Sequence, residues 1–435
     1  MTHVAMPDTG LGVAGAAPLA GTPLDHARAG LDACVHCGFC MQACPTYLAL
    51  DDENDSPRGR LLLMRSMLDG ALSPDDEAAR GHLDSCLGCR ACETVCPSGV
   101  PYGHLLEATR ATLTKRHPLP IIARMMLAVF ASPVMMRLSM RMAQLLRTSR
   151  LGAALAAVLP GRVGVAFAML EATRPGLKSR TYVAKGTGEL GTVAILEGCV
   201  MDGLYGGTNA ATARTLTMNG YRCAEAEGQA CCGALHAHAG DLDAAKKMAK
   251  RNIAAFERSG ADSIASNAAG CGAMLKEYGQ LLADEPEWAD RARRIASKAR
   301  DVSELLATAG PLEGGRLEMR VTYDAPCHLI HAQRVSAPPL KVLGAIPGLT
   351  IVPLVDSDKC CGAAGIYNLL QPETSAAVLE PKLANIASTK AEFVATGNPG
   401  CLMQIGAGLK REGSDARVVH PVDLLDASYA ARFSR

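Results

Sequence analysis

The chain has 435 residues, which is enough for two or three domains with a hydrophobic core each. Its formal net charge of +1 and its aromatic content of 4% argue against a nucleic-acid partner, because such partners need basic surfaces and stacking rings. Seventeen cysteines in a chain of this size, with no signal peptide at its start, favour a reducing cytoplasm in which thiols bind metal.

The first residues, 1–21, are rich in glycine, alanine and proline. They contain neither a basic start nor a continuous apolar run, so they do not match a secretory leader. We expect this segment to be a disordered tail.

Two cysteine runs of the same form, C-x2-C-x2-C-x3-C-P, lie at 34–45 and 86–97. This is the spacing of bacterial two-cluster ferredoxins, in which the fourth cysteine of each run ligates the other cluster. Structural zinc is the alternative, but it explains neither the third cysteine nor the proline. We therefore predict two [4Fe-4S] clusters, one held by Cys34, Cys37, Cys40 and Cys96 and the other by Cys86, Cys89, Cys92 and Cys44.

Residues 22–112 are thus predicted to form an all-α, ferredoxin-like domain with two [4Fe-4S] clusters. Between the cysteine runs, Pro57 followed by an apolar run to Leu68 predicts a helix. Arg58 and Arg60 at its start either place positive charge near the clusters or are solvated, and the sequence leaves both possibilities open.

Residues 113–189 predict an amphipathic helical linker of two or three helices, rich in methionine, leucine and arginine. Arginines interrupt every apolar run well short of the roughly 18 residues that a membrane-spanning helix needs. The helices are either a docking surface for another subunit or the membrane interface, or ordinary core helices between two domains.

From residue 190 onwards, short apolar runs alternate with longer helical patterns, which predicts parallel α/β units. The pattern occurs twice, and we expect one domain at 190–312 and a second at 313–435. The glycines at 186, 188 and 191 spell G-x-G-x-x-G, but they precede the strand expected at 192–196. A phosphate-binding loop has to follow its strand, so we interpret these glycines as an ordinary loop.

Each α/β copy contains a single cysteine, then a Cys-Cys-Gly sequence, then another single cysteine, and counterparts lie 128 to 130 residues apart. The single cysteines follow expected strands, so they should gather at one edge of each sheet. Duplicated soft thiols favour an iron–sulfur or zinc site over a packing role. The candidate ligands of a possible further cluster are Cys199, Cys231, Cys232, Cys271, Cys327, Cys360, Cys361 and Cys401. Cys223 has no counterpart and is interpreted as structural.

The duplicated Cys-Cys-Gly pattern resembles the CCG cysteine-rich domains of heterodisulfide reductases and flavin-linked dehydrogenases. Together with the two-cluster ferredoxin motif, it is similar to the iron–sulfur subunits of glycolate oxidase and of anaerobic glycerol-3-phosphate dehydrogenase. The segments 34–40, 56–60, 92–100 and 231–238 are most similar to the glycolate oxidase family. Cys271 and Cys401 lack the C-x2-C ending of the fullest CCG pattern, so each copy offers four cysteines instead of five. This departure argues against the non-cubane double clusters of heterodisulfide reductase and leaves open a single cubane, either on one repeat or on ligands shared by both.

The resemblance implies an electron-transfer subunit of a membrane-associated glycolate dehydrogenase complex. Partner subunits would hold FAD and oxidise glycolate, and this chain would pass electrons toward quinone, from a cytoplasmic position on the inner face of the membrane. The isolated chain would then be inactive on substrate, and no catalytic residue is assigned to it. The alternatives are the equivalent subunit for glycerol-3-phosphate or lactate, a CCG-type disulfide reductase, and a zinc-stabilised scaffold.

Overall fold

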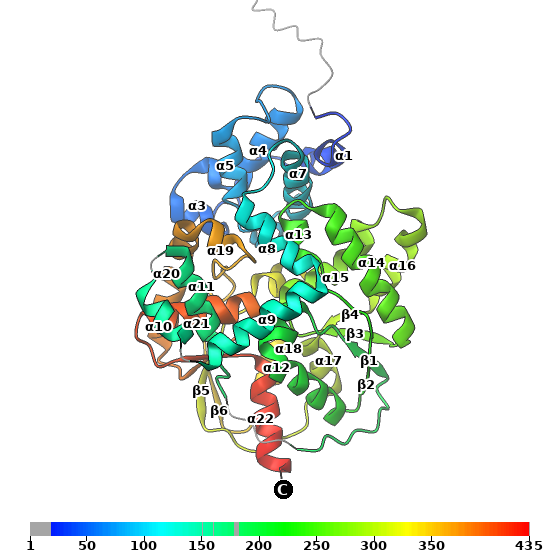
Figure 1. The fold of residues 1–435 in the computed structure, drawn as a ribbon, viewed down its shortest axis with the longest axis vertical. Coiled ribbons are helices and arrows are strands. Elements are labelled where there is room, and N and C mark those ends of the chain that lie inside the picture. Colours follow the sequence, from blue (N-terminus) through cyan, green and yellow to red (C-terminus); the bar gives the residue numbers. More distant parts are fainter. Residues whose placement is uncertain (1–18, 150, 160, 178–181, 435) are drawn as a thin grey trace, which may run out of the picture.

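The computed structural model describes residues 19–149, 151–159, 161–177 and 182–434. The expected tail at 1–21 lies outside these residues except for its last three, and Leu19 is buried in the N-terminal core. The N-terminal helical part lies at one end of the molecule, and two α/β parts lie side by side below it (Figure 1).

Helices alone make up the regular structure of the described residues 19–116. Pro57 starts the longest helix between the cysteine runs, and the Ser56 side chain accepts a hydrogen bond from the Gly59 N–H. Leucines and methionines form the core, among them Leu24, Met64 and Leu105. The helices are α1 (Pro23–His26), α2 (Arg28–Asp32), α3 (Pro45–Leu50), α4 (Pro57–Leu68), α5 (Glu77–Asp84), α6 (Ala91–Thr94) and α7 (Tyr102–Arg116), with a 3-10 turn at Glu53–Asp55.

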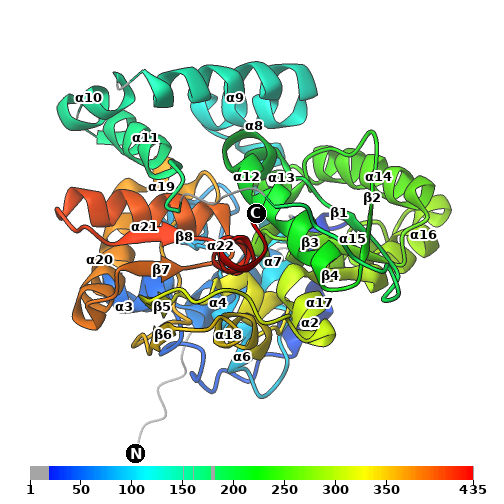
Figure 2. The same ribbon diagram turned by 90° about the horizontal axis from the view of Figure 1, so that it is seen from below.

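The linker forms more helices than the two or three that were predicted. They are α8 (Ile121–Ala131), α9 (Pro133–Thr148), α10 (Leu151–Val158) and α11 (Gly161–Ala172). In Figure 2, α9, α10 and α11 form a layer along one side of the molecule. Among the described residues no single helix has the length and apolar character to cross a membrane. Only α8 and α9 together meet both criteria, and the chain bends by 103° between them.

Two four-stranded parallel sheets carry the α/β parts, with the orders β2-β1-β3-β4 and β6-β5-β7-β8. In each sheet the first strand of the repeat lies between the second and the third, so Val193 pairs with Cys223 on one side and with Ser263 on the other. The strands are β1 (Thr192–Ile195), β2 (Arg222–Ala224), β3 (Ser263–Ser266), β4 (Ala299–Asp301), β5 (Met319–Tyr323), β6 (Leu349–Val352), β7 (Phe393–Ala395) and β8 (Arg417–Val419). The predicted class, a helical ferredoxin-like part with duplicated α/β domains, is confirmed.

The helices of the α/β parts cover both faces of each sheet. The first repeat has α12 (Cys199–Met218), α13 (Ala234–His238), α14 (Leu242–Ser259), α15 (Ala269–Leu281), α16 (Pro286–Lys298) and α17 (Val302–Ala309). The second has α18 (Ala337–Gly344), α19 (Tyr367–Leu370), α20 (Pro372–Thr389), α21 (Pro399–Arg411) and α22 (Pro421–Phe433), with a π-helical turn at His328–Ala332.

One large hydrophobic core joins the two repeats. It contains Val193 and Leu216 of the first repeat together with Val321, Val342 and Leu424 of the second. Separate cores lie between the first sheet and α14 to α16, and between the second sheet and α20 and α21. The repeats therefore pack as a pair, which fixes the position of one cysteine edge relative to the other.

Candidate metal centres

The first ferredoxin site is a pocket lined by Cys34, Cys37, Cys40 and Cys96. The loop after α2 supplies the first three, and its tight path uses positive φ angles at His36 and Gly38. The fourth comes from the second cysteine run, as the two-cluster spacing requires. Burial raises the pKa of Cys40 to about 11. Four thiols that converge on one pocket are the donor set of a [4Fe-4S] cluster.

The second ferredoxin site is more deeply buried. Cys86, Cys89 and Cys92 are each less than a tenth exposed, and so is Cys44, the residue just before α3. Burial raises the pKa of Cys89 and of Cys92, and the neighbouring thiols, Cys44 and Cys86 among them, raise both pKa values further. The convergence of four buried thiols is the donor set that a [4Fe-4S] cluster needs. The assignment of ligands to each cluster stays a prediction.

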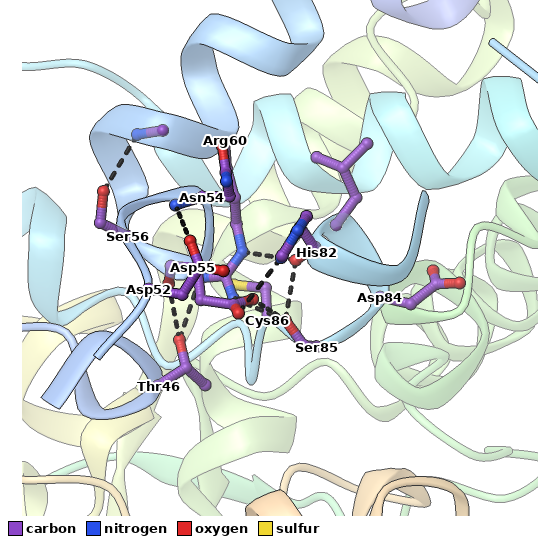
Figure 3. A network of polar contacts seen from close by, with 12 residues as sticks. Thr46, Asp52, Asn54, Asp55, Ser56, Arg60, His82, Asp84, Ser85 and Cys86 are labelled. Carbon is purple, nitrogen blue, oxygen red and sulfur yellow. Dashed lines mark hydrogen bonds and ion pairs between the residues drawn. The ribbon is translucent and has the colours of Figure 1, made fainter. Parts of the chain in front are cut away.

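A buried guanidinium lies beside the second site (Figure 3). The Arg60 side chain is fully buried, and its Nη2 contacts Asp55 Oδ1 at 2.9 Å and Ser85 Oγ at 2.8 Å. Its Nη1 donates to Thr46 Oγ1 at 3.0 Å and lies 3.9 Å from Cys44 Sγ. Arg60 is therefore a fixed positive charge next to a predicted cluster ligand.

Arg58, two residues earlier, lines the first pocket instead. It is partly exposed and forms an ion pair with Glu53. Gly59 separates the two arginines, and a Cβ there would lie 2.1 Å from Glu53 O. Only glycine thus allows this helix start to pack on the 3-10 turn and direct one arginine toward each site.

The cysteines of each α/β repeat lie in close pairs at the carboxyl edge of the sheet. Cys199 and Cys327 follow the first strand of their repeats, while Cys271 and Cys401 follow the third. The second strand of each repeat is added on one side of the first strand and the third strand on the other, so the first and third strands flank the switch point where open α/β sheets bind ligands. The Sγ–Sγ distances are 3.5 Å for Cys199–Cys231, 3.2 Å for Cys232–Cys271, 3.9 Å for Cys327–Cys360 and 3.2 Å for Cys361–Cys401.

The glycine after each cysteine pair is required by the backbone. Gly233 and Gly362 have φ angles of 92° and 80°. A Cβ at Gly362 would also lie 2.6 Å from Ser375 O. A sharp turn is therefore present in both repeats, and it directs both thiols of the adjacent cysteine pair to the site.

The two adjacent cysteines of each Cys-Cys-Gly sequence differ in pKa. The pKa of Cys231 is lowered by hydrogen bonds with Cys199 and Cys232, whereas that of Cys232 is raised. In the second repeat the pKa of Cys361 is lowered by hydrogen bonds with Cys360 and Cys401, and the Lys382 charge lowers it further. Each repeat thus has a thiol that ionises readily and is suited to binding a soft metal.

The thiols of the two repeats do not form a closed set of zinc ligands among the described residues. In a tetrahedral zinc site with Zn–S bonds of about 2.3 Å, all four sulfurs lie about 3.8 Å from one another. Among the described residues, only Asp52, Asp55 and His82 form a trio of potential ligand atoms within 4.8 Å of one another. In this trio Asp55 forms ion pairs with Arg60 and with His82. In the described residues the repeat cysteines therefore meet as pairs, and no three of their sulfur atoms lie within 4.8 Å of one another.

The two repeats surround their cysteines with different charges. At the eleventh residue of α20, Lys382 is buried and its Nζ lies 2.6 Å from Asp324 Oδ1. The eleventh residue of α14 is Asn252, which donates to Tyr278 Oη and to Cys231 O. The second site therefore has a buried cation where the first has a neutral amide.

The ferredoxin part packs against the cysteine edges of the repeats. Leu87, Cys89 and Ala91 share a hydrophobic core with Cys327 and Cys360. The hydroxyl of Tyr367 donates to Ser85 O at 2.7 Å, next to Cys86. Thiols of the second ferredoxin site and of the second repeat therefore line one continuous buried region.

Four histidines lie near the repeat cysteines, and only one contacts a sulfur. His328 Nδ1 is 3.5 Å from Cys327 Sγ, and the His328 ring packs on that of His238 with centroids 5.3 Å apart. His236, His238 and His331 bond to Leu127 O, Glu107 and Thr94. Sequence reasoning missed Lys382 and Asp324 and left the role of Arg60 open, since each of these residues pairs with residues distant along the chain.

Comparison with protein-family models places two known domain types on this chain. A 4Fe-4S dicluster domain matches residues 30–100, and a cysteine-rich domain matches residues 193–276 and again 321–406. The fold and the cysteine sets thus define an iron–sulfur protein with a two-cluster ferredoxin-like domain and two cysteine-rich domains.

Full-length relatives define the family more narrowly. The chain is 39% identical over 414 residues to the "Probable glycolate oxidase iron-sulfur subunit" of Bacillus subtilis, covering 90% of this chain and 92% of that protein. It is 37% identical to the "Glycolate oxidase iron-sulfur subunit" of Escherichia coli, over 85% and 88% of the two chains. It is 32% identical to "Lactate utilization protein A" of Shouchella clausii, over 54% of this chain and 98% of that protein. The chain belongs to the family of glycolate oxidase iron–sulfur subunits, so the resemblance inferred from its sequence is confirmed.

Proposed function

We propose that this protein is the electron-transfer subunit of a flavin-dependent glycolate dehydrogenase complex. A partner subunit would hold FAD and oxidise glycolate, and this chain would carry the electrons toward quinone. The complex would be cytoplasmic and peripheral on the inner face of the membrane. The names of the relatives support glycolate as the substrate.

The observation that carries the proposal is the shared buried region of two thiol sets. Cys89 of the second ferredoxin site packs with Cys327 and Cys360 of the second repeat. Electron transfer needs redox centres at short range, and a common core supplies that proximity. Clusters bound at these thiols would provide one-electron chemistry.

The residues of this chain hold and insulate those centres. Cys34, Cys37, Cys40 and Cys96 surround the more open pocket, while Cys86, Cys89, Cys92 and Cys44 lie in the buried core. The exposed loop at Cys37 makes the first site the accessible end of the chain of thiols. We infer that electrons enter at this end and move inward toward the second repeat.

The test uses the protein purified without oxygen together with its co-expressed flavoprotein partner. Glycolate should reduce the bound flavin and then a quinone analogue. In a Cys89→Ser, Cys92→Ser variant the flavin should still be reduced by glycolate, while quinone reduction should fall at least tenfold. Glycolate oxidation by this chain alone, or quinone reduction that persists in the variant, would refute the proposal.

Lactate is the second candidate substrate, because a lactate utilization protein matches over almost its whole length. The same assay distinguishes the two substrates. Reduction of the bound flavin by lactate but not by glycolate would assign this chain to lactate oxidation.

A further inference from the structure

Helix α9 has two apolar faces with opposite surroundings. Its inner face packs on α12: Met140 lies against Gly203, and Gln144 Nε2 donates to Gly203 O at 2.6 Å. The outer face consists of apolar residues three or four positions apart, and their side chains are 53% to 67% exposed. The residues of this face are Val134, Leu138, Met142 and Leu145. A helix that is already packed on one side thus leaves a second apolar stripe uncovered.

Helix α8 continues this exposed surface. Ala123 and Leu127 are buried in a core with Ile366, while Ile121 and Met125 on its other side are 73% and 66% exposed. Both helices lie on the near face of the molecule in Figure 1, where no other labelled element crosses them. We call the outer residues Ile121, Ile122, Met125, Val134, Met135, Leu138, Met142 and Leu145 the α8–α9 face.

The charges around this face have one sign. Residues 108–170 contain no aspartate or glutamate, although the whole chain has 43, and they contain nine lysines and arginines. Arg124, Arg137 and Arg141 lie on α8 and α9, and none of them has a carboxylate partner within the described part of the chain. Apolar stripes flanked by unpaired arginines are the signature of a helix that binds an anionic lipid surface.

The dimensions favour a helix pair that lies on the bilayer. With 11 and 16 residues, α8 and α9 are about 17 Å and 24 Å long, shorter than the roughly 30 Å hydrocarbon core. The chain also bends by 103° between them, so the two helices do not form one straight span. A protein partner would have to place acidic side chains opposite the three arginines. An anionic membrane offers both negative headgroups for the arginines and an apolar interior for the exposed apolar side chains.

We propose that the α8–α9 face binds the surface of an anionic phospholipid bilayer. The outer side chains enter the headgroup boundary, and Arg124, Arg137 and Arg141 contact lipid phosphates. This proposal rests on the proposed function in one respect, since delivery of electrons to quinone requires a position at the membrane. It assigns that position to two helices of this chain.

Vesicle flotation of the full, iron-loaded chain tests the proposal. We expect binding to vesicles of phosphatidylglycerol and phosphatidylcholine, and at least tenfold weaker binding to phosphatidylcholine alone. Replacing the three arginines by glutamine should weaken binding to the anionic vesicles on the order of a hundredfold, because each surface arginine contributes about fivefold.

Leu138→Glu is the second variant, and Val355→Glu is its control, since the two parent side chains are 66% and 64% exposed. We expect the first to abolish flotation and the second to leave it unchanged, with iron content and circular dichroism equal in both. Equal flotation of the two variants, or no binding to anionic vesicles at low salt, would overturn the proposal. So would loss of the flavoprotein partner in Leu138→Glu with flotation unchanged, because the face would then be a subunit interface. Glycolate-dependent dye reduction by the soluble complex tests the proposed function separately.

Discussion

Arg60 is expected to raise the reduction potential of the cluster held by Cys44, Cys86, Cys89 and Cys92. A buried positive charge favours the reduced, more negative form of a neighbouring cluster. Arg60 Nη1 lies 3.9 Å from Cys44 Sγ. At this distance and an effective dielectric constant of about 20, a unit charge contributes about 4 kcal/mol. The electron added on reduction is spread over the whole cluster and not held at Cys44 Sγ. The distance from Arg60 to the added charge is therefore taken as about twice the distance from Arg60 to this sulfur.

At about 8 Å the same charge contributes about 2 kcal/mol, or about 90 mV for a one-electron couple. We therefore predict that Arg60→Met lowers the potential of this cluster by about 90 mV. Arg60→Lys keeps the charge and should lower it much less. Arg65→Met is the matched control, since Arg65 lies on the same helix but is 35% exposed and pairs with Asp32 at the surface.

The assay is a potentiometric titration followed by EPR, in protein purified without oxygen. Arg60→Met also leaves Asp55 without its main partner in the interior, so a loss of stability of about 3–5 kcal/mol is expected. A double variant, Arg60→Met with Asp55→Asn, removes both charges and should bring the potential back toward the wild-type value. Potentials equal to wild type in fully loaded Arg60→Met would refute the reasoning.

Three further predictions follow from the structure. Cys96→Ser should remove the EPR signal of one cluster and Cys44→Ser that of the other, with a loss of about four irons per chain in each. Gly362→Ala should lower the urea midpoint more than Gly413→Ala, because both have positive φ but only Gly362 would clash, at 2.6 Å from Ser375 O. Burial raises the pKa of Asp423 to about 7, so the folded state holds a proton that the unfolded state loses near pH 4. Wild-type stability should therefore fall relative to Asp423→Asn as pH rises from about 4 to about 7, measured by urea midpoints followed through Trp288 fluorescence, and parallel pH profiles would contradict this.

The sequence predicted those features whose signal is local. The cysteine runs, the duplicated Cys-Cys-Gly turns and the central strands β1, β3, β5 and β7 all have a pattern within a short window. The strands β2, β4 and β8 were not predicted, because each has only three residues and an edge position. Periodicity cannot distinguish such a short segment from a loop.

The features that could not be predicted depend on pairing across the chain. Arg60 looks like any charged residue at a helix start until Thr46 and Ser85 surround it. Lys382 has the same ambiguity, since its partner Asp324 lies 58 residues earlier. The outer face of α9 was also undecided, because the sequence shows two apolar stripes and only the packing on α12 shows which one is covered.

The two repeats have diverged in the property that matters most for an electron carrier. Each repeat presents four cysteines at the switch point of its own sheet, and the two sheets have equivalent strand orders, so both copies keep the same candidate ligands. Lys382 adds a buried charge at the second site, and the corresponding Asn252 adds none at the first. Because Lys382 is paired with the buried Asp324, the two charges largely offset each other at the second site, which is also the site that packs against Cys89. The two repeats therefore differ in position, since the thiols of the second repeat share a buried core with a thiol of the ferredoxin part.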